Sequence, residues 1–332
     1  MRTAIFKLIR LVIVVVVVTF LSFSMLKLQE ATTGSTIIEK IAPFGSPAAK
    51  AKLSESLHLK DPFFVQYGRW LGNAAQGDFG LQYTGTGDNA ANGTPVSTIV
   101  AKELPVSIEL MIYAQLLALA IALPLGIYTA YKNGSMIDKV TNIVMFAMLA
   151  MPAFLAGLAL QVWAAKNPNA GFPTQYTGVG DFPLTPFTSD NFTQMLLPTI
   201  SLAIAQIAVY MRLLRSDMIA TLQEDFITTA KSKGIPARRV LLRHAFRPSS
   251  LTLLTVAGLN VGALIGGAII VEQIFNLPGI GFELVRSILG TQVIETQAII
   301  AIIAVIYVLV NFLVDILYTV LDPRIRHARA IA

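Results

Sequence analysis

The sequence predicts an all-α membrane protein with six transmembrane helices. Hydrophobic residues make up 55% of the 332 positions and charged residues only 13%, whereas soluble domains carry about 25% charged residues. Apolar runs long enough to cross a bilayer, which takes roughly 20 helical residues, occur six times. Basic residues also gather in alternate connecting segments. We therefore expect residues 1–332 to form a single transmembrane domain.

The expected spans are residues 8–28, 107–131, 140–163, 195–214, 251–270 and 298–321. The first run follows Arg2, Lys7 and Arg10, an arrangement that signal peptides also have. Its apolar part is at the upper length limit for such a peptide, and no convincing small-x-small cleavage site follows it. We therefore favour an uncleaved membrane anchor.

The charge distribution predicts the orientation. With the N-terminus in the cytosol, the cytosolic segments hold 16 of the 25 lysines and arginines. The outer segments hold nine basic and thirteen acidic residues, which is the bias that the positive-inside rule expects. Both termini are then cytosolic, residues 29–106 form a large extracytoplasmic loop, and residues 215–250 are cytosolic. The net charge of +6 is explained by topology, so no nucleic-acid partner is indicated.

The long outer loop carries five aromatic residues that predict a small packed cap on the outer face: Phe63, Phe64, Tyr67, Trp70 and Phe79. A later outer segment, residues 271–297, contains the compact turn 276–281, which we expect to dip back toward the membrane.

No catalytic chemistry is indicated by the sequence. It has no cysteine and only three histidines, and it lacks the G-x-x-x-x-G-K-[ST], H-E-x-x-H and G-x-S-x-G patterns. We therefore predict no catalytic site, no metal site and no cofactor. No internal repeat is evident, which weakens a secondary-transporter interpretation. The chain is expected to move a solute without converting it.

The cytosolic loop contains a short predicted helix at residues 224–234. Glu224 and Asp225 lie at its N-terminus and Lys231 and Lys233 near its C-terminus, as the helix dipole favours. Gly234 suits a left-handed cap that ends the helix.

One face of this helix should carry Phe226, Ala230 and Gly234, which are spaced four residues apart. The alternative is a helix lying flat on the membrane interface. Its charged ends and small, polar middle instead favour docking in a groove of a cytosolic protein.

The fifth span has glycines four apart, Gly258, Gly262 and Gly266, with Gly267 adjacent. Such spacing permits close helix packing, which we favour over a face that slides against a partner subunit. Asn260 lies near this stripe, and an interhelical hydrogen bond is favoured over a place on the transport path.

Polar groups in other spans give weaker path candidates. In the sixth span, Asp315 needs a partner because an unpaired carboxylate in hydrocarbon is costly, and a nearby arginine or backbone donor is expected. Gln115, Gln161 and Gln206 are the remaining candidates for lining a polar route.

Several blocks together resemble the membrane permease subunits of oligopeptide/dipeptide-type ABC importers. Residues 225–240, D-F-I-T-T-A-K-S-K-G-I-P-A-R-R-V, are similar to that family's coupling-helix signature. The similarity continues through residues 65–71, 77–80, 103–110, 243–247, 274–281, 309–318 and 321–325. The sequence departs from the family's pattern in three places. Residues 28–34 stand where the family has a Pro-Gly-Asp turn, and Pro248 stands in place of an Asn. The outer loop is also enlarged near residues 83–93.

The resemblance implies a type I ABC importer-like permease of the bacterial inner membrane, pairing with a second permease subunit. Two ATPase subunits, or one fused pair, would hydrolyse ATP, and an extracytoplasmic binding protein would deliver peptide. The implied ATPase-coupling residues are Glu224, Asp225, Phe226, Ala230, Lys231, Lys233, Gly234, Arg238 and Arg239. Relatives vary in solute, so nickel, haem or a glycopeptide stay open, as do a secondary transporter and a non-transporting scaffold.

Overall fold

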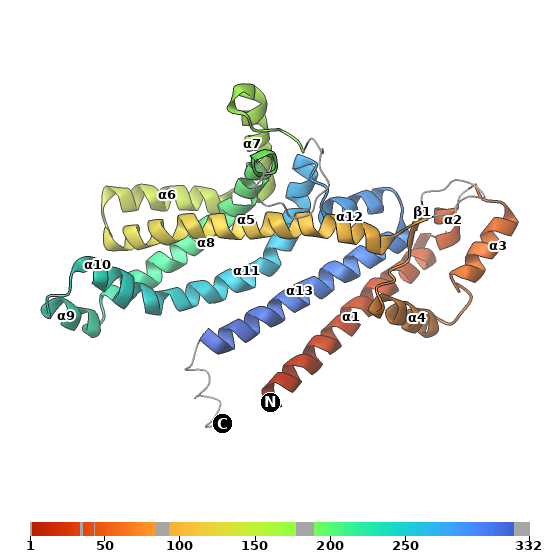
Figure 1. Cartoon of the computed structure of the whole chain (residues 1–332), viewed down its shortest axis with the longest axis horizontal. Helices are drawn as coiled ribbons and strands as arrows, with labels where there is room; N and C mark the ends of the chain where they lie inside the picture. The colour runs from red at the N-terminus through yellow and green to blue at the C-terminus, as the bar shows by residue number, and fades with distance from the viewer. Residues whose placement is uncertain (1, 34–35, 43, 84–92, 177–188, 322–332) are drawn as a thin grey trace. The chain divides into compact units, whose positions relative to one another are not determined.

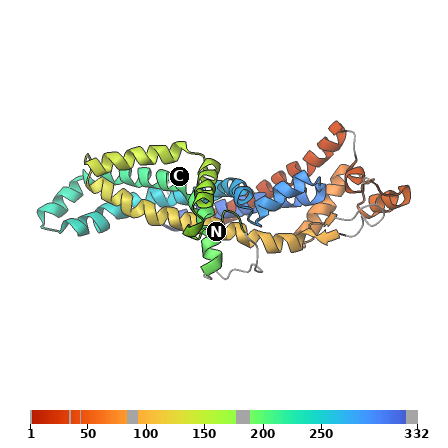
Figure 2. The same cartoon turned by 90° about the horizontal axis from the view of Figure 1, so that it is seen from above.

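A computed structural model shows a chain built almost entirely from helices, drawn in two views in Figures 1 and 2. It describes residues 2–33, 36–42, 44–83, 93–176 and 189–321. The chain divides into two compact units, which are described separately. The first unit comprises Met1–Ser107 and Pro278–Leu309, and the second comprises Ile108–Leu277 and Val310–Ala332.

The first unit combines a long N-terminal helix with short helices and one small hairpin. Its elements are α1 (Arg2–Thr33), α2 (Ile37–Ile41), α3 (Pro47–Ser56), α4 (Phe63–Ala75), β1 (Leu81–Tyr83), β2 (Gly93–Pro95), the start of α5 (Val96–Tyr131), α12 (Ile280–Leu289) and the first part of α13 (Val293–Leu321). Thr36 and Glu39 form a capping box that starts α2. The two strands pair antiparallel, with Leu81 opposite Pro95.

Most of the aromatic residues of the predicted cap lie on α4 and pack against α1. The ring of Tyr67 packs edge-on against Phe20 at 5.3 Å between centroids, and its hydroxyl donates to the Val16 carbonyl at 2.9 Å. Phe63 and Trp70 pack against Phe23. The aromatic residues are therefore packed, but against the middle of the helix that carries the first predicted span. Phe79 instead joins a separate cluster around Val96 and Ile280.

The second unit is a bundle of long helices. Its elements are most of α5, then α6 (Met136–Ala150), α7 (Ala153–Lys166), the 3₁₀ turn η2 (Pro168–Ala170), α8 (Ser189–Leu222), α9 (Asp225–Ser232), α10 (Ala237–Arg239), the π-helical turn η3 (Val240–Ala245), α11 (Phe246–Phe275) and the end of α13. Helices α8 and α11 run side by side (Figure 1), and α6 and α7 pack on α8. Tyr210, Met211, Leu214 and Met218 form the buried face of α8, each under 2% exposed.

The third predicted span is not one helix. Helices α6 and α7 meet at an angle of 102°, and Figure 1 shows α7 turning sharply away from α6. Pro152 precedes α7 and cannot continue the hydrogen-bond ladder of α6, while Met151 is extended at ψ 115°. The apolar run is long enough to span, but its proline divides it.

Among the described residues, four helices are long and apolar enough to cross a membrane: Val96–Tyr131, Phe192–Leu222, Ala237–Phe275 and Val293–Val314. The bent pair α6 and α7 brings the number to five if it counts as one span. The first predicted run lies in α1, where the apolar stretch Leu11–Met25 is shorter. The fold is therefore that of a multi-pass membrane protein, and the sixth span stays a prediction.

Candidate functional site

Helix α9 is a short, separate helix between the end of α8 and the start of α11 (Figure 1). Glu224 is extended at ψ 148°, and its carbonyl accepts the Ile227 N–H at 3.0 Å to open the helix. Gly234 adopts the left-handed conformation at φ 73°, and the Ile235 N–H donates to the Ala230 carbonyl. The predicted helix and its glycine cap are therefore confirmed, within a residue or two at each end.

The two faces of α9 differ in burial. Ile227 is fully buried and Ala230 is 6% exposed, so both face the protein, whereas Phe226 is 48% exposed. The expectation of one shared docking face for Phe226 and Ala230 is therefore wrong in part. The four-residue spacing places them near each other, but Ala230 lies with Ile227 on the side of the helix that packs against the protein. The rest of the predicted coupling set is exposed, namely Glu224, Asp225, Lys231, Lys233, Gly234, Arg238 and Arg239.

The base of this loop is closed by local contacts. Pro236 starts α10, and its carbonyl accepts the N–H groups of Arg239 and Val240. At the base, the hydroxyls of Thr221 and Ser249 lie 3.0 Å apart, and Ser249 also donates to the Ala245 carbonyl. The end of α8 and the start of α11 are thereby joined at the base of the loop that carries α9.

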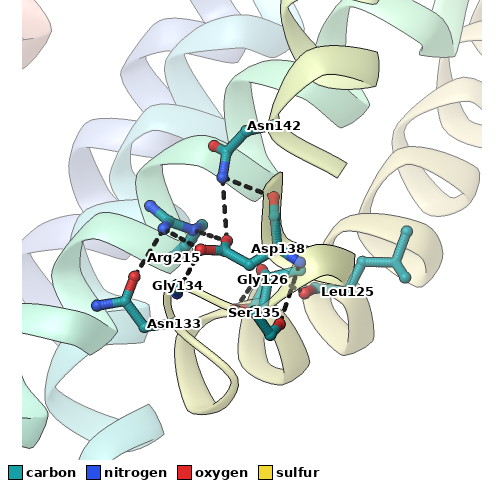
Figure 3. A network of polar contacts seen from close by, with 9 residues as sticks. Leu125, Gly126, Asn133, Gly134, Ser135, Asp138, Asn142 and Arg215 are labelled. Atoms are coloured by element: carbon teal, nitrogen blue, oxygen red, sulfur yellow. Dashed lines mark hydrogen bonds and ion pairs between the residues drawn. The ribbon is translucent and has the colours of Figure 1, made fainter. Parts of the chain in front are cut away.

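A buried ion pair lies in the same helical unit, between the first turn of α6 and α8 (Figure 3). Arg215 Nε donates to Asp138 Oδ1 at 2.6 Å, and a terminal guanidinium nitrogen donates to Oδ2 at 2.8 Å. That nitrogen also donates to the side-chain oxygen of Asn133 at 3.0 Å. Asp138 is only 3% exposed. Bidentate geometry of this kind makes the interaction strong and directional.

The Asp138 carboxylate is fully supplied with donors. Besides Arg215, it accepts the Gly134 N–H at 2.9 Å and the Asn142 side-chain amide at 3.0 Å. Ser135 caps α6 by accepting the Asp138 N–H. The sequence does not single out Asp138, because nothing local indicates a partner 77 residues away.

Polar side chains from three helices also meet inside the second unit. The Tyr210 hydroxyl of α8 donates to Gln115 Oε1 of α5 at 3.0 Å. Asn260 of α11 donates to Gln206 Oε1 of α8 at 3.0 Å, which confirms the interhelical hydrogen bond expected for Asn260. Gln161 of α7 donates to the carbonyls of Thr174 and Ile274, so it joins α7 to the segment that follows η2 and to the end of α11.

The glycines of α11 have different surroundings. A Cβ added at Gly258 would lie 2.6 Å from Val314 Cγ1, and one at Gly267 would lie 2.8 Å from Leu202 Cδ1. Both glycines therefore permit close helix packing within this chain. Gly262 is buried, whereas a Cβ at Gly266 would meet nothing within 4 Å. The side chain of Asp315 lies outside the described residues, so its expected pairing stays a prediction.

The first unit has its own buried polar cluster. Gln82 of β1 donates to Glu283 Oε1 at 3.1 Å and to Glu295 Oε2 at 2.9 Å. Arg286 pairs with the other Glu283 oxygen at 3.2 Å. The cluster ties the hairpin to α12 and α13, and sequence reasoning missed it because Gln82 lies 201 residues from Glu283 and 213 from Glu295. Within the described part of the chain, no group of three His, Cys, Asp or Glu is arranged to hold a metal.

Known proteins are similar in sequence over nearly the whole chain. Over 314 residues it is 36% identical to the oligopeptide transport system permease protein AppB of Bacillus subtilis (strain 168), covering 93% of this chain and 94% of that protein. It is 32% identical to the dipeptide transport system permease protein DppB of Escherichia coli (strain K12), covering 86% of this chain and 87% of that protein. It is 31% identical to the dipeptide transport system permease protein DppB of Alkalihalophilus pseudofirmus, covering 97% of this chain and 98% of that protein.

Residues 122–327 match the family described as "Binding-protein-dependent transport system inner membrane component". This range includes α9, the Asp138–Arg215 pair and the glycines of α11. The chain therefore belongs to this family and is a multi-pass inner-membrane permease component of an ABC transporter.

Proposed function

We propose that this chain is one transmembrane subunit of an ATP-driven peptide importer and forms half of the path that the peptide crosses. The relatives that cover most of its length are named as peptide permeases. A second permease subunit would complete the path, and an extracytoplasmic binding protein would deliver the peptide. Two ATPase subunits, or one fused pair, would hydrolyse ATP.

The observation that carries the coupling role is the two-sided character of α9. Ile227 and Ala230 fix one side of the helix to the bundle, while Phe226 and the charged ends stay exposed. The exposed Phe226 suits insertion into a groove of a partner protein, and Lys231 and Lys233 at the other end of the helix suit an acidic edge on that groove. Movement of that groove on ATP binding would pull α8 and α11 through the joined base of the loop.

The proposed topology has six crossings: α1, α5, the bent pair α6–α7, α8, α11 and α13. Both termini and residues 215–250 are then cytosolic, and residues 29–106 lie outside. At about 1.5 Å per residue, the 36 residues of α5 extend well beyond a ~30 Å hydrocarbon core. The N-terminal part of α5 therefore extends into the outer compartment.

The test is purification of the chain with its associated subunits, followed by reconstitution with the binding protein and peptide. We expect stoichiometric ATPase subunits and peptide uptake that requires ATP. Uptake of nickel, haem or a glycopeptide in preference to peptides would contradict the proposed substrate, but the proposal of an ATP-driven importer would stand. Uptake driven by an ion gradient, with no associated ATPase, would contradict the proposal and indicate a secondary transporter.

A further inference from the structure

The first unit contains a cavity of about 420 Å³ between α1, α4, the turn before α4, β1 and the start of α13. This volume falls in the range of small-ligand sites. Its apolar wall is built by side chains that include Phe23, Leu57, Leu59, Trp70, Leu81 and Ile294. The permease role described above assigns nothing to this cavity.

Two hydrogen-bond donors line the cavity without a partner. Gln297 is only 5% exposed, and its Nε2 makes no hydrogen bond. The indole nitrogen of Trp70 is also buried without a partner. Buried donors of this kind are costly, because they have lost water without gaining an acceptor. A ligand with acceptor oxygens would satisfy both.

Lys27 on α1 is the cation that favours an anionic ligand in the cavity. Among the other described residues that line it, Arg69 is already paired with Asp61 at 3.1 Å, and the acid is Asp78. That acid already accepts the Gly80 N–H at 3.0 Å. Burial and the nearby Asp78 raise the pKa of Tyr83, so its phenol stays neutral at physiological pH and adds no negative charge.

The cavity opens beside a surface of α1 that suits lipid. Phe23 and Lys27 line the cavity, while Leu21, Met25 and Leu28 on the adjoining stripe are 57%, 68% and 64% exposed. A lysine and aromatic residues at the end of an apolar run are typical of a membrane interface. An acyl chain lying along this stripe would place its head group at the cavity mouth.

We propose that this cavity binds the head group and upper acyl chain of an anionic phospholipid. The ester and phosphate oxygens would accept from Gln297 and Trp70, and the phosphate would lie near Lys27. The bound lipid would contact α1, α4 and β1, which all contribute to the cavity wall. The inference that the outer leaflet supplies this lipid rests on the proposed topology.

The test uses the assembled transporter in lipid nanodiscs that contain brominated lipid, which quenches nearby tryptophan fluorescence. The chain has two tryptophans, so Trp163→Phe isolates Trp70, and a Trp163→Phe/Trp70→Phe chain gives the blank for the partner subunits. We expect half-quenching of Trp70 at an about fivefold lower mole fraction of brominated phosphatidylglycerol than of brominated phosphatidylcholine.

In this background Lys27→Gln should abolish the preference for phosphatidylglycerol, because the cation that attracts its net negative charge is lost. Gln297→Leu should raise the mole fraction of either lipid needed for half-quenching, because one of the two donors is lost. Gln76→Leu is the matched control for Gln297→Leu: this exposed glutamine bonds within α4 and its turn, and quenching should be unchanged. Equal quenching by both lipids, an unchanged preference in Lys27→Gln, or unchanged quenching in Gln297→Leu would overturn the proposal. So would displacement of the brominated lipid by an acidic apolar peptide, which would assign the cavity to peptide.

The quenching requires neither ATP nor transport. Failure of ATP-driven uptake would therefore contradict the proposed function and leave the lipid site standing, and the reverse also holds.

Discussion

Helix α9 and the Asp138–Arg215 pair lie in the same unit but differ in how the sequence specifies them. Helix α9 is defined within eleven residues by acids at its start, lysines at its end and a glycine cap. The ion pair depends on two side chains 77 residues apart, and Gly134 and Asn142 supply the remaining donors to its carboxylate.

The two regions also differ in what burial does. Helix α9 exposes an aromatic and several charges that its own chain leaves available, as an interaction surface does. In the ion pair, each charge is removed from water and is stabilised by the opposite charge of its partner, so the pair has a structural role. We therefore expect mutations in the pair to change stability first, and mutations on the exposed face of α9 to change partner binding first.

The largest expected effect is on the ion pair. Asp138→Ala leaves the Arg215 guanidinium partly buried without its carboxylate, and breaking a buried pair on one side typically costs about 3–5 kcal/mol. Thermal unfolding of the purified complex should show a clearly lower midpoint. The matched control is Glu55→Ala, an exposed acid of α3, for which no change is expected. A wild-type midpoint in Asp138→Ala would mean that the pair does not hold α6 to α8.

The next effect separates the two faces of α9. Ile227→Ala removes a fully buried side chain, and such truncations cost about 2–5 kcal/mol. The loop should become sensitive to limited proteolysis and lose its ATPase subunits. Phe226→Ala should lose the ATPase subunits while the loop keeps wild-type resistance to protease. Equal protease sensitivity in the two variants would remove the distinction between an anchoring and a docking face.

A smaller effect is expected at the cap. Gly234 has φ 73° and no atom within 4 Å of an added Cβ, so Gly234→Val strains the backbone without a clash. The left-handed conformation costs a side chain about 1–2 kcal/mol. We expect normal insertion, with reduced substrate-stimulated ATP hydrolysis and uptake. Gly234→Asn is the control, since asparagine tolerates this conformation, and both activities should be largely retained. Wild-type activities in Gly234→Val would refute the role of the cap.

The smallest effect is electrostatic. Lys231→Glu/Lys233→Glu should weaken ATPase association between about twofold and tenfold, because exposed charges contribute little each. The deficit should be greatest at low salt, where screening is weakest. Co-purification equal to the wild type at low salt would contradict the assignment of these lysines to the interface.

Local signals accounted for α9 but not for the surroundings of its residues. The acids, lysines and glycine predicted where the helix begins and ends, and the structure confirms this. Periodicity placed Phe226 near Ala230, but it does not say which side meets the bundle. That is decided by burial of Ile227, which depends on the fold around the loop.

Two other features show why the rest of the fold was harder to predict. Pro152 was visible in the sequence, yet the length of the apolar run suggested one span, and the structure bends it by 102°. The Gln82–Glu283–Glu295 cluster joins segments more than 200 residues apart, and no local pattern encodes such a contact. Asn260 was easier, because a polar side chain inside an apolar helix has few partners other than a neighbouring helix.

The most direct test of the coupling role is the accessibility of α9 in the membrane. The chain has no cysteine, so Ser232→Cys, at an exposed position of α9, provides a single thiol in this subunit and keeps Phe226. Lys52→Cys provides a control in the proposed outer loop. We predict that an impermeant thiol reagent labels Ser232→Cys only from the cytosolic side and that bound ATPase subunits block this labelling. Labelling of Ser232→Cys from the outer side, under conditions that also label Lys52→Cys, would contradict the account.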